Sequence, residues 1–150
     1  MNAIPKPRII LMAEDDSDDR LLAQDALLES GLATEVHFVE DGVELMDYLT
    51  RKNKFTQLAN TPRPGLIILD LNMPKKDGRE ALREIRANPE LRKIPVVVFT
   101  TSTADSDIAR VYDLGANSFI SKPVAFNSLV GVMKAIGQYW FHVVVLPVKA

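Results

Sequence analysis

Four carboxylates follow predicted buried strands, and their residue types suit a metal ion. Glu14, Asp15 and Asp16 come directly after one apolar stretch, and Asp70 ends another. If the two strands are neighbours in a parallel sheet, these acids meet at its carboxyl edge, where open α/β sheets bind ligands. Clustered carboxylates repel one another unless a cation or a proton lies between them. Oxygen ligands without His or Cys indicate a hard ion such as Mg²⁺.

Two further polar side chains end predicted strands and could contact a phosphoryl group. Thr100 ends one strand, and Lys122 follows another and precedes Pro123. A hydroxyl can donate to an oxyanion, and a lysine ammonium is a compact charge that pairs with phosphate. Taken alone, Thr100 could equally cap the next helix, and Lys122 would be an ordinary surface charge. The bond between Lys122 and Pro123 is a candidate for the cis isomer.

Together these residues describe phosphoryl transfer onto Asp70. The metal ion and the lysine would neutralise charge on the transferring group, and the carboxylate would attack as a nucleophile. The signals are weak singly. They become strong because they fall at the ends of the first, third, fourth and fifth predicted strands.

The elements that must position these residues alternate between strand and helix. Buried strands are predicted at 8–13, 34–39, 66–70, 96–100 and 118–121, and helices at 17–30, 43–51, 78–88, 106–114 and 126–139. Continuous apolar strands between helices indicate a parallel sheet that is covered on both faces. Two segments are additional to these alternating strands and helices, namely a long polar segment, 52–64, and an apolar tail, 140–150. The apolar side of the first helix is predicted to comprise Leu21, Leu22, Ala26, Leu27 and Leu28.

The composition excludes several classes of function. The 150 residues suit a single domain, and a net charge of −2 gives no general attraction to nucleic acid. The absence of Cys excludes disulfides and thiolate metal sites and is compatible with the cytosol. No apolar run approaches the length that spans a membrane. His37 and His142 lack companion ligands and are interpreted as structural.

In order and spacing, the motifs resemble those of the receiver domain of two-component response regulators. The resemblance covers about residues 7–139 and implies an α/β fold. That fold is a three-layer, doubly wound (βα)5 flavodoxin-like parallel sheet with strand order 2-1-3-4-5. The matching motifs are Glu14-Asp15-Asp16, Asp70-Leu71-Asn72-Met73-Pro74, Asp77-Gly78, Thr100, Gly115-Ala116 and Lys122-Pro123.

The resemblance assigns roles to individual residues. It implies that Asp70 accepts a phosphoryl group from a sensor histidine kinase. It also implies that Mg²⁺ is held by Asp15, Asp70 and the backbone carbonyl of Asn72, with Glu14 acting through water. The register favours Glu14 and Asp15 as the metal-binding pair and leaves Asp16 as a possible helix cap.

Further roles concern the response to phosphorylation. Phe119 stands at the position of the family's switch aromatic, which swings inward when phosphorylated Asp70 draws Thr100 toward it. Thr101 stands where the family mostly has a smaller residue, and its branched side chain would narrow access to the phosphate. Asp19 lies in the first turn of the first helix and is interpreted as a partner of the helix dipole.

The long segment and the tail are similar to those of stand-alone response regulators paired with bacterial phytochromes, especially the cyanobacterial type. This narrower resemblance implies a red/far-red light-sensing histidine kinase as phosphodonor and a homodimer. We expect one cytoplasmic receiver domain over residues 1–150, with no partner nucleic acid or membrane. We expect no output domain after the receiver and therefore expect output through protein–protein contact. The apolar tail would pack either on its own domain or across a dimer.

Three rival functions were weighed against this interpretation. A magnesium phosphohydrolase of the haloacid-dehalogenase type also uses an aspartate nucleophile, but it needs an acid two residues later, where this chain has Asn72. A nucleotide-binding Rossmann unit needs a Gly-rich turn where the acidic run stands. A phosphorylation-independent, receiver-like binding module is the alternative that stays open, although all the reactive residues are present. We expect a phosphoacceptor signalling protein rather than an enzyme.

Overall fold

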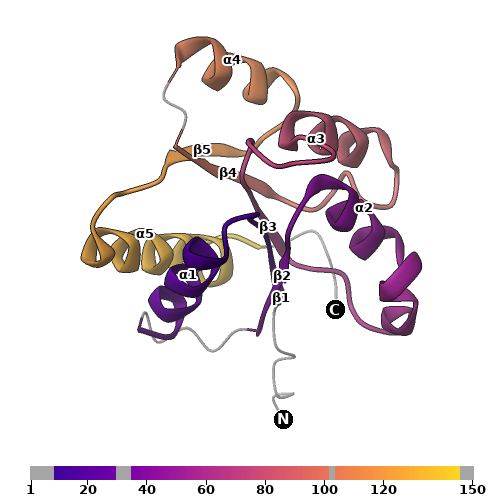
Figure 1. Cartoon of the computed structure of the whole chain (residues 1–150), viewed down its shortest axis with the longest axis horizontal. Coiled ribbons are helices and arrows are strands. Elements are labelled where there is room, and N and C mark those ends of the chain that lie inside the picture. Colours follow the sequence, from indigo (N-terminus) through magenta and orange to yellow (C-terminus); the bar gives the residue numbers. More distant parts are fainter. Residues whose placement is uncertain (1–8, 30–34, 102–103, 146–150) are drawn as a thin grey trace.

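The strands of the computed structural model form one parallel sheet (Figure 1). The structure describes residues 9–29, 35–101 and 104–145. The order β2-β1-β3-β4-β5 confirms the predicted flavodoxin-like topology. The strands are β1 (Ile9–Ala13), β2 (Glu35–Val39), β3 (Leu66–Leu69), β4 (Val96–Thr100) and β5 (Ser118–Ser121).

Helices cover both faces of the sheet and complete the three layers. Helices α1 and α5 lie on one face, and α2 and α3 lie on the other (Figure 1). Asp41 and Asp77 cap α2 and α3, because their carboxylates accept from backbone N–H groups of the first turn. The helices are α1 (Ser17–Glu29), α2 (Gly42–Thr50), α3 (Gly78–Ala87), α4 (Asp105–Asp113) and α5 (Phe126–Gln138).

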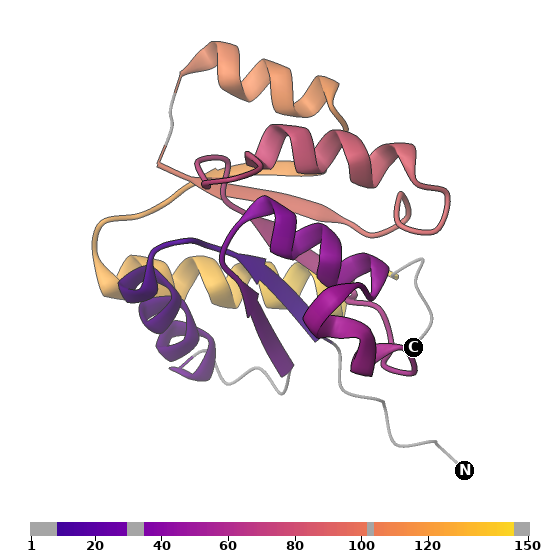
Figure 2. The same ribbon diagram turned by 45° about the vertical axis from the view of Figure 1, so that its right-hand side comes forward.

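The polar segment 52–64 contains a short helix that the sequence did not predict. This is the 3₁₀ helix η1 (Asn53–Leu58), the magenta turn beside the end of α2 in Figure 2. Helix α2 ends at Arg51, whose φ of 59° lies in the left-handed region and turns the chain toward η1. Phe55 of η1 packs edge-on against Tyr48. The segment is therefore attached to α2 and is more than a connecting loop.

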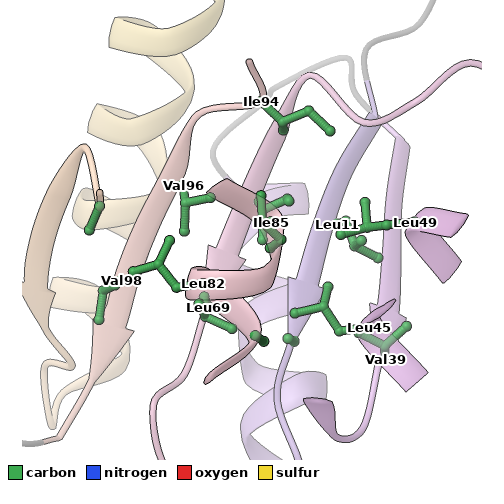
Figure 3. Packing of buried hydrophobic residues seen from close by; sticks show 14 of the residues in the cluster. Leu11, Val39, Leu45, Leu49, Leu69, Leu82, Ile85, Ile94, Val96 and Val98 are labelled. Carbon is green, nitrogen blue, oxygen red and sulfur yellow. The ribbon is translucent and has the colours of Figure 1, made fainter. Parts of the chain in front are cut away.

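The core has two parts, one on each face of the sheet. Successive side chains of a strand point to opposite faces, so β1 sends Leu11 to one part and Ile10 to the other. Figure 3 shows the first part, where strand residues meet α2 and α3. Leu82 and Ile85 of α3 are fully buried there. Burial on both faces explains why the three central strands, β1, β3 and β4, are almost continuously apolar.

The expected apolar side of α1 was partly wrong. Ala26 and Leu27 are buried, together with Ala23, but Leu21, Leu22 and Leu28 are exposed by 58%, 43% and 73%. The stripe of α1 that faces the core is therefore narrower than its many leucines suggested. These leucines form exposed apolar surface. Among the described residues, no helix combines the length and the apolar character that crossing a membrane requires.

The apolar tail begins by packing on its own domain. Helix α5 runs into a π-helical turn, η2 (Tyr139–Val143). Phe141 is only 8% exposed and belongs to the second part of the core, against which Trp140 also packs. Val145 is fully exposed. Residues 146–150 and the side chain of His142 lie outside what the structure describes, so the expectations for them remain predictions.

We predict that Phe141→Ala lowers the free energy of unfolding by about 3–5 kcal/mol, because it removes a buried aromatic ring from the core. Val145→Ala is the matched control and should change stability by less than about 0.5 kcal/mol, because that side chain is exposed. Urea denaturation at several protein concentrations measures both. If the loss of unfolding free energy in Phe141→Ala vanishes on dilution, Phe141 packs between two chains, which would contradict its packing within one chain.

Candidate phosphoacceptor and metal site

The register of the sheet brings the predicted site residues to one edge. Ala13 pairs with Leu69 across β1 and β3, so Glu14 and Asp70 leave their strands side by side. Thr100 pairs with Ser121 across β4 and β5, which places Lys122 beside the end of β4. The structure thus gathers residues that are far apart in the sequence.

Both oxygens of the Asp70 carboxylate have hydrogen-bond donors. Its Oδ1 accepts from the Thr100 hydroxyl at 2.9 Å and from the backbone N–H of Asn72 at 3.2 Å. Its Oδ2 accepts from the Lys122 ammonium at 3.0 Å. Asp70 is nearly buried, and Thr100 is completely buried. The carboxylate is therefore held in one orientation by contacts from two neighbouring strand ends and its own loop.

Lys122 is the positive centre of the site. Its ammonium contacts the carboxylates of Glu14 and Asp70, and it lies 3.5 Å from Oδ2 of Asp19. Burial lowers the pKa of Lys122, but the two buried carboxylates outweigh that effect and raise this pKa above its usual value.

The suggestion that the bond between Lys122 and Pro123 is cis was wrong, because the described residues contain no cis peptide bond and this bond is trans.

Glu14 is the most deeply buried acid of the site, with 1% of its surface exposed. Burial raises the pKa of Glu14 to about 7, the nearby charge of Asp70 adds to the rise, and contact with Lys122 opposes it. Arg20 fixes the backbone here by donating to the Glu14 carbonyl at 2.8 Å. Burial at this position therefore favours the protonated form of Glu14 more than exposure to solvent would.

The arrangement of carboxylates fits a divalent cation. Glu14, Asp15 and Asp70 each offer one oxygen, and these oxygens lie within 4.8 Å of one another. Asp15 is exposed, so the cluster is open to solvent on that side. Oxygen ligands and open positions suit Mg²⁺, which retains several waters in proteins. Asp16 instead caps α1, because its Oδ1 accepts from the backbone N–H of Asp18 at 2.9 Å and of Asp19 at 3.0 Å.

The loop after Asp70 folds back tightly over the end of β3. A Cβ at Gly78 would lie 2.4 Å from the carbonyl oxygen of Asp70, so only glycine fits there. Lys75 has a φ of 67°, a left-handed conformation that side chains other than glycine rarely adopt. The backbone N–H of Gly78 donates to the Leu71 carbonyl at 2.9 Å. The Asp77-Gly78 motif therefore closes a compact loop around the candidate phosphoacceptor.

The residues expected to respond to phosphorylation lie along β4 and β5. Phe119 is half-buried and packs against the first part of the core, and its backbone N–H donates to the Tyr112 hydroxyl of α4 at 3.1 Å. Thr101 is exposed and borders a cavity of about 380 Å³ beside Lys122. The Thr100 hydroxyl contacts Asp70. The inward swing of Phe119 stays a prediction.

Sequence reasoning missed two contacts. Asp19 was expected only to interact with the helix dipole, but it also faces Lys122. Its position one helical turn after Glu14-Asp15-Asp16 is the sequence signal that could have indicated this contact. Arg79 donates to Asp77 at 2.8 Å and to Asp107 of α4 at 2.9 Å, and so ties the loop after β3 to α4. No sequence pattern marks that pairing. His37 contacts Tyr48 and Glu35, in accord with its structural interpretation.

A family model and a curated relative both indicate similarity to response regulators. The family model of the response regulator receiver domain matches residues 10–134. Response regulator Rcp1 of Synechocystis sp. is 40% identical over 141 residues, which cover 94% of this chain and 94% of Rcp1.

Solved structures agree with the sequence matches. The phosphorylated cyanobacterial phytochrome response regulator RcpA superimposes with a TM-score of 0.87 at 43% identity, covering 95% of this chain and 99% of that one. The Mn²⁺-bound form of Rcp1 superimposes with a TM-score of 0.84 at 40% identity, with coverages of 94% and 99%.

We predict that the native chain loses stability as the pH rises from 4.5 to about 7 without divalent cations, and that Glu14→Gln removes this loss. The raised pKa means that the folded chain binds this proton more tightly than the unfolded chain. The contribution is therefore fully present below 4.5 and disappears as the pH rises through about 7.

Urea denaturation in a chelating buffer, at several pH values, measures this difference. Glu80→Gln, at an exposed glutamate of α3, is the control and should keep the native pH dependence. The assignment fails if Glu14→Gln and the native chain show the same pH dependence.

Proposed function

The chain belongs to the response regulator receiver family, and from this premise we propose that it accepts a phosphoryl group on Asp70 from a sensor histidine kinase. Members of this family are signalling proteins of two-component systems rather than enzymes with external substrates. The observation that carries the proposal is the position of Asp70, which touches Thr100 and Lys122 and lies beside Glu14 and Asp15.

The side chains around Asp70 suit a displacement at phosphorus. An Asp70 oxygen forms the new P–O bond while the P–N bond of a phosphohistidine breaks, and the imidazole keeps the electron pair. Lys122 is placed to neutralise charge on the transferred group, and the Thr100 hydroxyl can donate to one of its oxygens. Glu14, Asp15, Asp70 and the Asn72 carbonyl would hold Mg²⁺, which supplies charge neutralisation when bound.

Phosphorylation would reach the surface through β4 and β5. An acyl phosphate adds roughly −1.5 to −2 charges beside Thr100 and Lys122. Each new charge-assisted hydrogen bond contributes about 1.5–3 kcal/mol, and complete reversal of a two-state surface needs about 5.5 kcal/mol. Thr100 and Lys122 already contact the Asp70 carboxylate, so two such contacts with the phosphoryl oxygens would supply part of this free energy. Phe119 and its Tyr112 partner on α4 are the surface that this shift would alter.

A phytochrome-type kinase is the donor that we propose. The support is the similarity, at 40–43% identity, to Rcp1 and to the phytochrome response regulator RcpA. Exposed apolar side chains beside the site, Leu22 of α1 and Val124 after β5, offer a surface that a kinase could contact. The kinase must bring its phosphohistidine to Asp70, so the two proteins share a compartment, and we propose that it is the cytoplasm.

We propose that output proceeds by protein–protein contact and that one such contact is a homodimer. We treat residues 1–150 as one receiver domain with the apolar extension 140–150. A hollow of about 530 Å³ lies between β5 and the end of α5, and its lining includes Ile120, Val132, Tyr139 and Trp140. Tyr139 is 51% exposed although it is aromatic. Apolar surface of this kind marks interaction sites.

We predict that a small acyl-phosphate donor adds one phosphoryl group to the native chain, that the reaction needs Mg²⁺, and that Asp70→Asn abolishes it. The asparagine removes the attacking oxygen but keeps the shape of the side chain. Intact mass with and without Mg²⁺ measures the adduct. A phosphorylated phytochrome-type histidine kinase should likewise label the native chain and not the variant.

Persistent labelling of Asp70→Asn would overturn the assignment of the acceptor. No adduct on the native chain under any condition would favour the phosphorylation-independent binding module. Far-ultraviolet circular dichroism of the variant shows whether the loss reflects chemistry rather than unfolding.

For the homodimer, we predict that Tyr139→Glu shifts the chain to monomer at concentrations where the native chain dimerises, because it places a charge in an apolar contact. Leu28→Glu, at an exposed leucine of α1 that does not line this hollow, is the control and should leave the dimer intact. Sedimentation equilibrium gives the dimer association constants of the native chain and of the two variants. A native chain that is monomeric at every concentration would contradict the proposal.

A further inference from the structure

A second concave site lies at the opposite edge of the sheet from Asp70. It is a cavity of about 310 Å³, lined by the end of α2, the residues after η1 and the connection between α3 and β4. Gly65, just after this lining, donates to the carbonyl of Ile9 at the start of β1, so the cavity lies at the amino edge. In Figure 2, η1 and the end of α2 are at the lower right, away from the β1–α1 connection.

The charge of this cavity is opposite to that of the whole chain. Among the described residues, Arg51, Arg63 and Lys93 line it, and Glu90 is the one carboxylate of the lining. The lining therefore carries a formal charge of +2 on a chain whose net charge is −2. A concave cationic surface concentrates anions in its vicinity.

Arg51 contributes positive charge that no carboxylate of the lining neutralises. Its guanidinium donates to three backbone carbonyls, those of Tyr48 at 2.7 Å, Thr61 at 3.0 Å and Pro62 at 3.3 Å. Burial lowers the pKa of Arg51, and the charge of Arg63 adds to this lowering. Arginine nevertheless stays protonated in proteins. The two guanidinium groups thus repel each other across the cavity wall, and an anion between them would relieve this repulsion.

The guanidinium of Arg63 has only part of its hydrogen-bonding capacity filled by the described residues. Its Nη2 contacts Oε2 of Glu90 at 3.1 Å, and its Nε is shielded from solvent and lacks a hydrogen-bond partner in the described part of the chain. The Glu90 side chain is 74% exposed, and exposed ion pairs are weak. An entering anion could therefore displace Glu90 and occupy the guanidinium fork.

We propose that this cavity binds a phosphate-sized oxyanion, the phosphate group of a small soluble ligand. The guanidinium fork of Arg63 matches two oxygens of a phosphate, and Lys93 adds a compact point charge. The cavity is small and concave, which suits a single anionic group better than an extended acidic peptide. The site is independent of phosphoryl transfer, because its residues come from the other edge of the sheet.

The test is a titration of the native, Mg²⁺-free chain with inorganic phosphate at constant ionic strength, followed by ¹H–¹⁵N nuclear magnetic resonance. We expect saturable shifts of the Arg63 and Lys93 amides and of the Arg63 Nε–H, with the Asp15 amide unchanged. Arg63→Gln should weaken binding about tenfold or more, the effect of losing a charge-assisted hydrogen bond. Glu90→Gln should strengthen it, because the competing carboxylate is gone.

Arg83→Gln is the matched control, because it removes an exposed arginine of α3 that does not line the cavity, and its affinity should equal that of the native chain. The proposal is overturned if chloride at equal ionic strength reproduces the shifts, or if Arg63→Gln and Arg83→Gln weaken binding equally. Binding only to phosphatidylglycerol vesicles, or only to an acidic peptide, would also overturn it. Unchanged amide spectra away from the cavity show that each variant is folded.

Discussion

A single ammonium group, that of Lys122, balances the carboxylates that the parallel sheet collects at its carboxyl edge. Its contacts with Glu14 and Asp70 join the ends of β1, β3 and β5. Without a cation, the buried acids would repel one another, and the raised pKa of Glu14 shows how strongly burial disfavours its charge. The carboxylates carry more negative charge than Lys122 neutralises, so a divalent cation suits the site. For the same reason, the charge of an incoming phosphoryl group must be neutralised.

The same edge connects chemistry to the surface of the molecule. Thr100 joins the Asp70 carboxylate to β4, and β5 carries both Lys122 and Phe119. Arg79 provides a second connection, because it bridges the loop after Asp70 to α4. Two connections thus lead from the surroundings of Asp70 to α4, one through β5 and one through Arg79. At the amino edge, the described lining of one cavity is cationic, so the two edges of one sheet suit different ligands.

Much of this arrangement could be predicted from residue patterns. The apolar strands fixed the class of fold, and Asp70, Thr100 and Lys122 were expected at one edge because parallel strands share a direction. Features set by tertiary contacts could not be predicted. The exposure of Leu21 depends on which stripe of α1 faces the core, and that stripe consists of Ala23, Ala26 and Leu27. The η1 helix depends on packing against Tyr48, and the pairing of Arg79 with Asp107 depends on the spacing between α3 and α4.

The central claim is that the Asp70 carboxylate itself carries the phosphoryl group. Borohydride reduces an acyl phosphate to an alcohol and leaves free carboxylates unchanged, so it marks the acceptor permanently. The decisive measurement is peptide mass mapping after phosphorylation with Mg²⁺ and borohydride reduction. The account predicts a reduced side chain at residue 70 and nowhere else. Reduction at Asp15 or Asp16, or a phosphoryl group that resists borohydride on a hydroxyl or histidine, would contradict it.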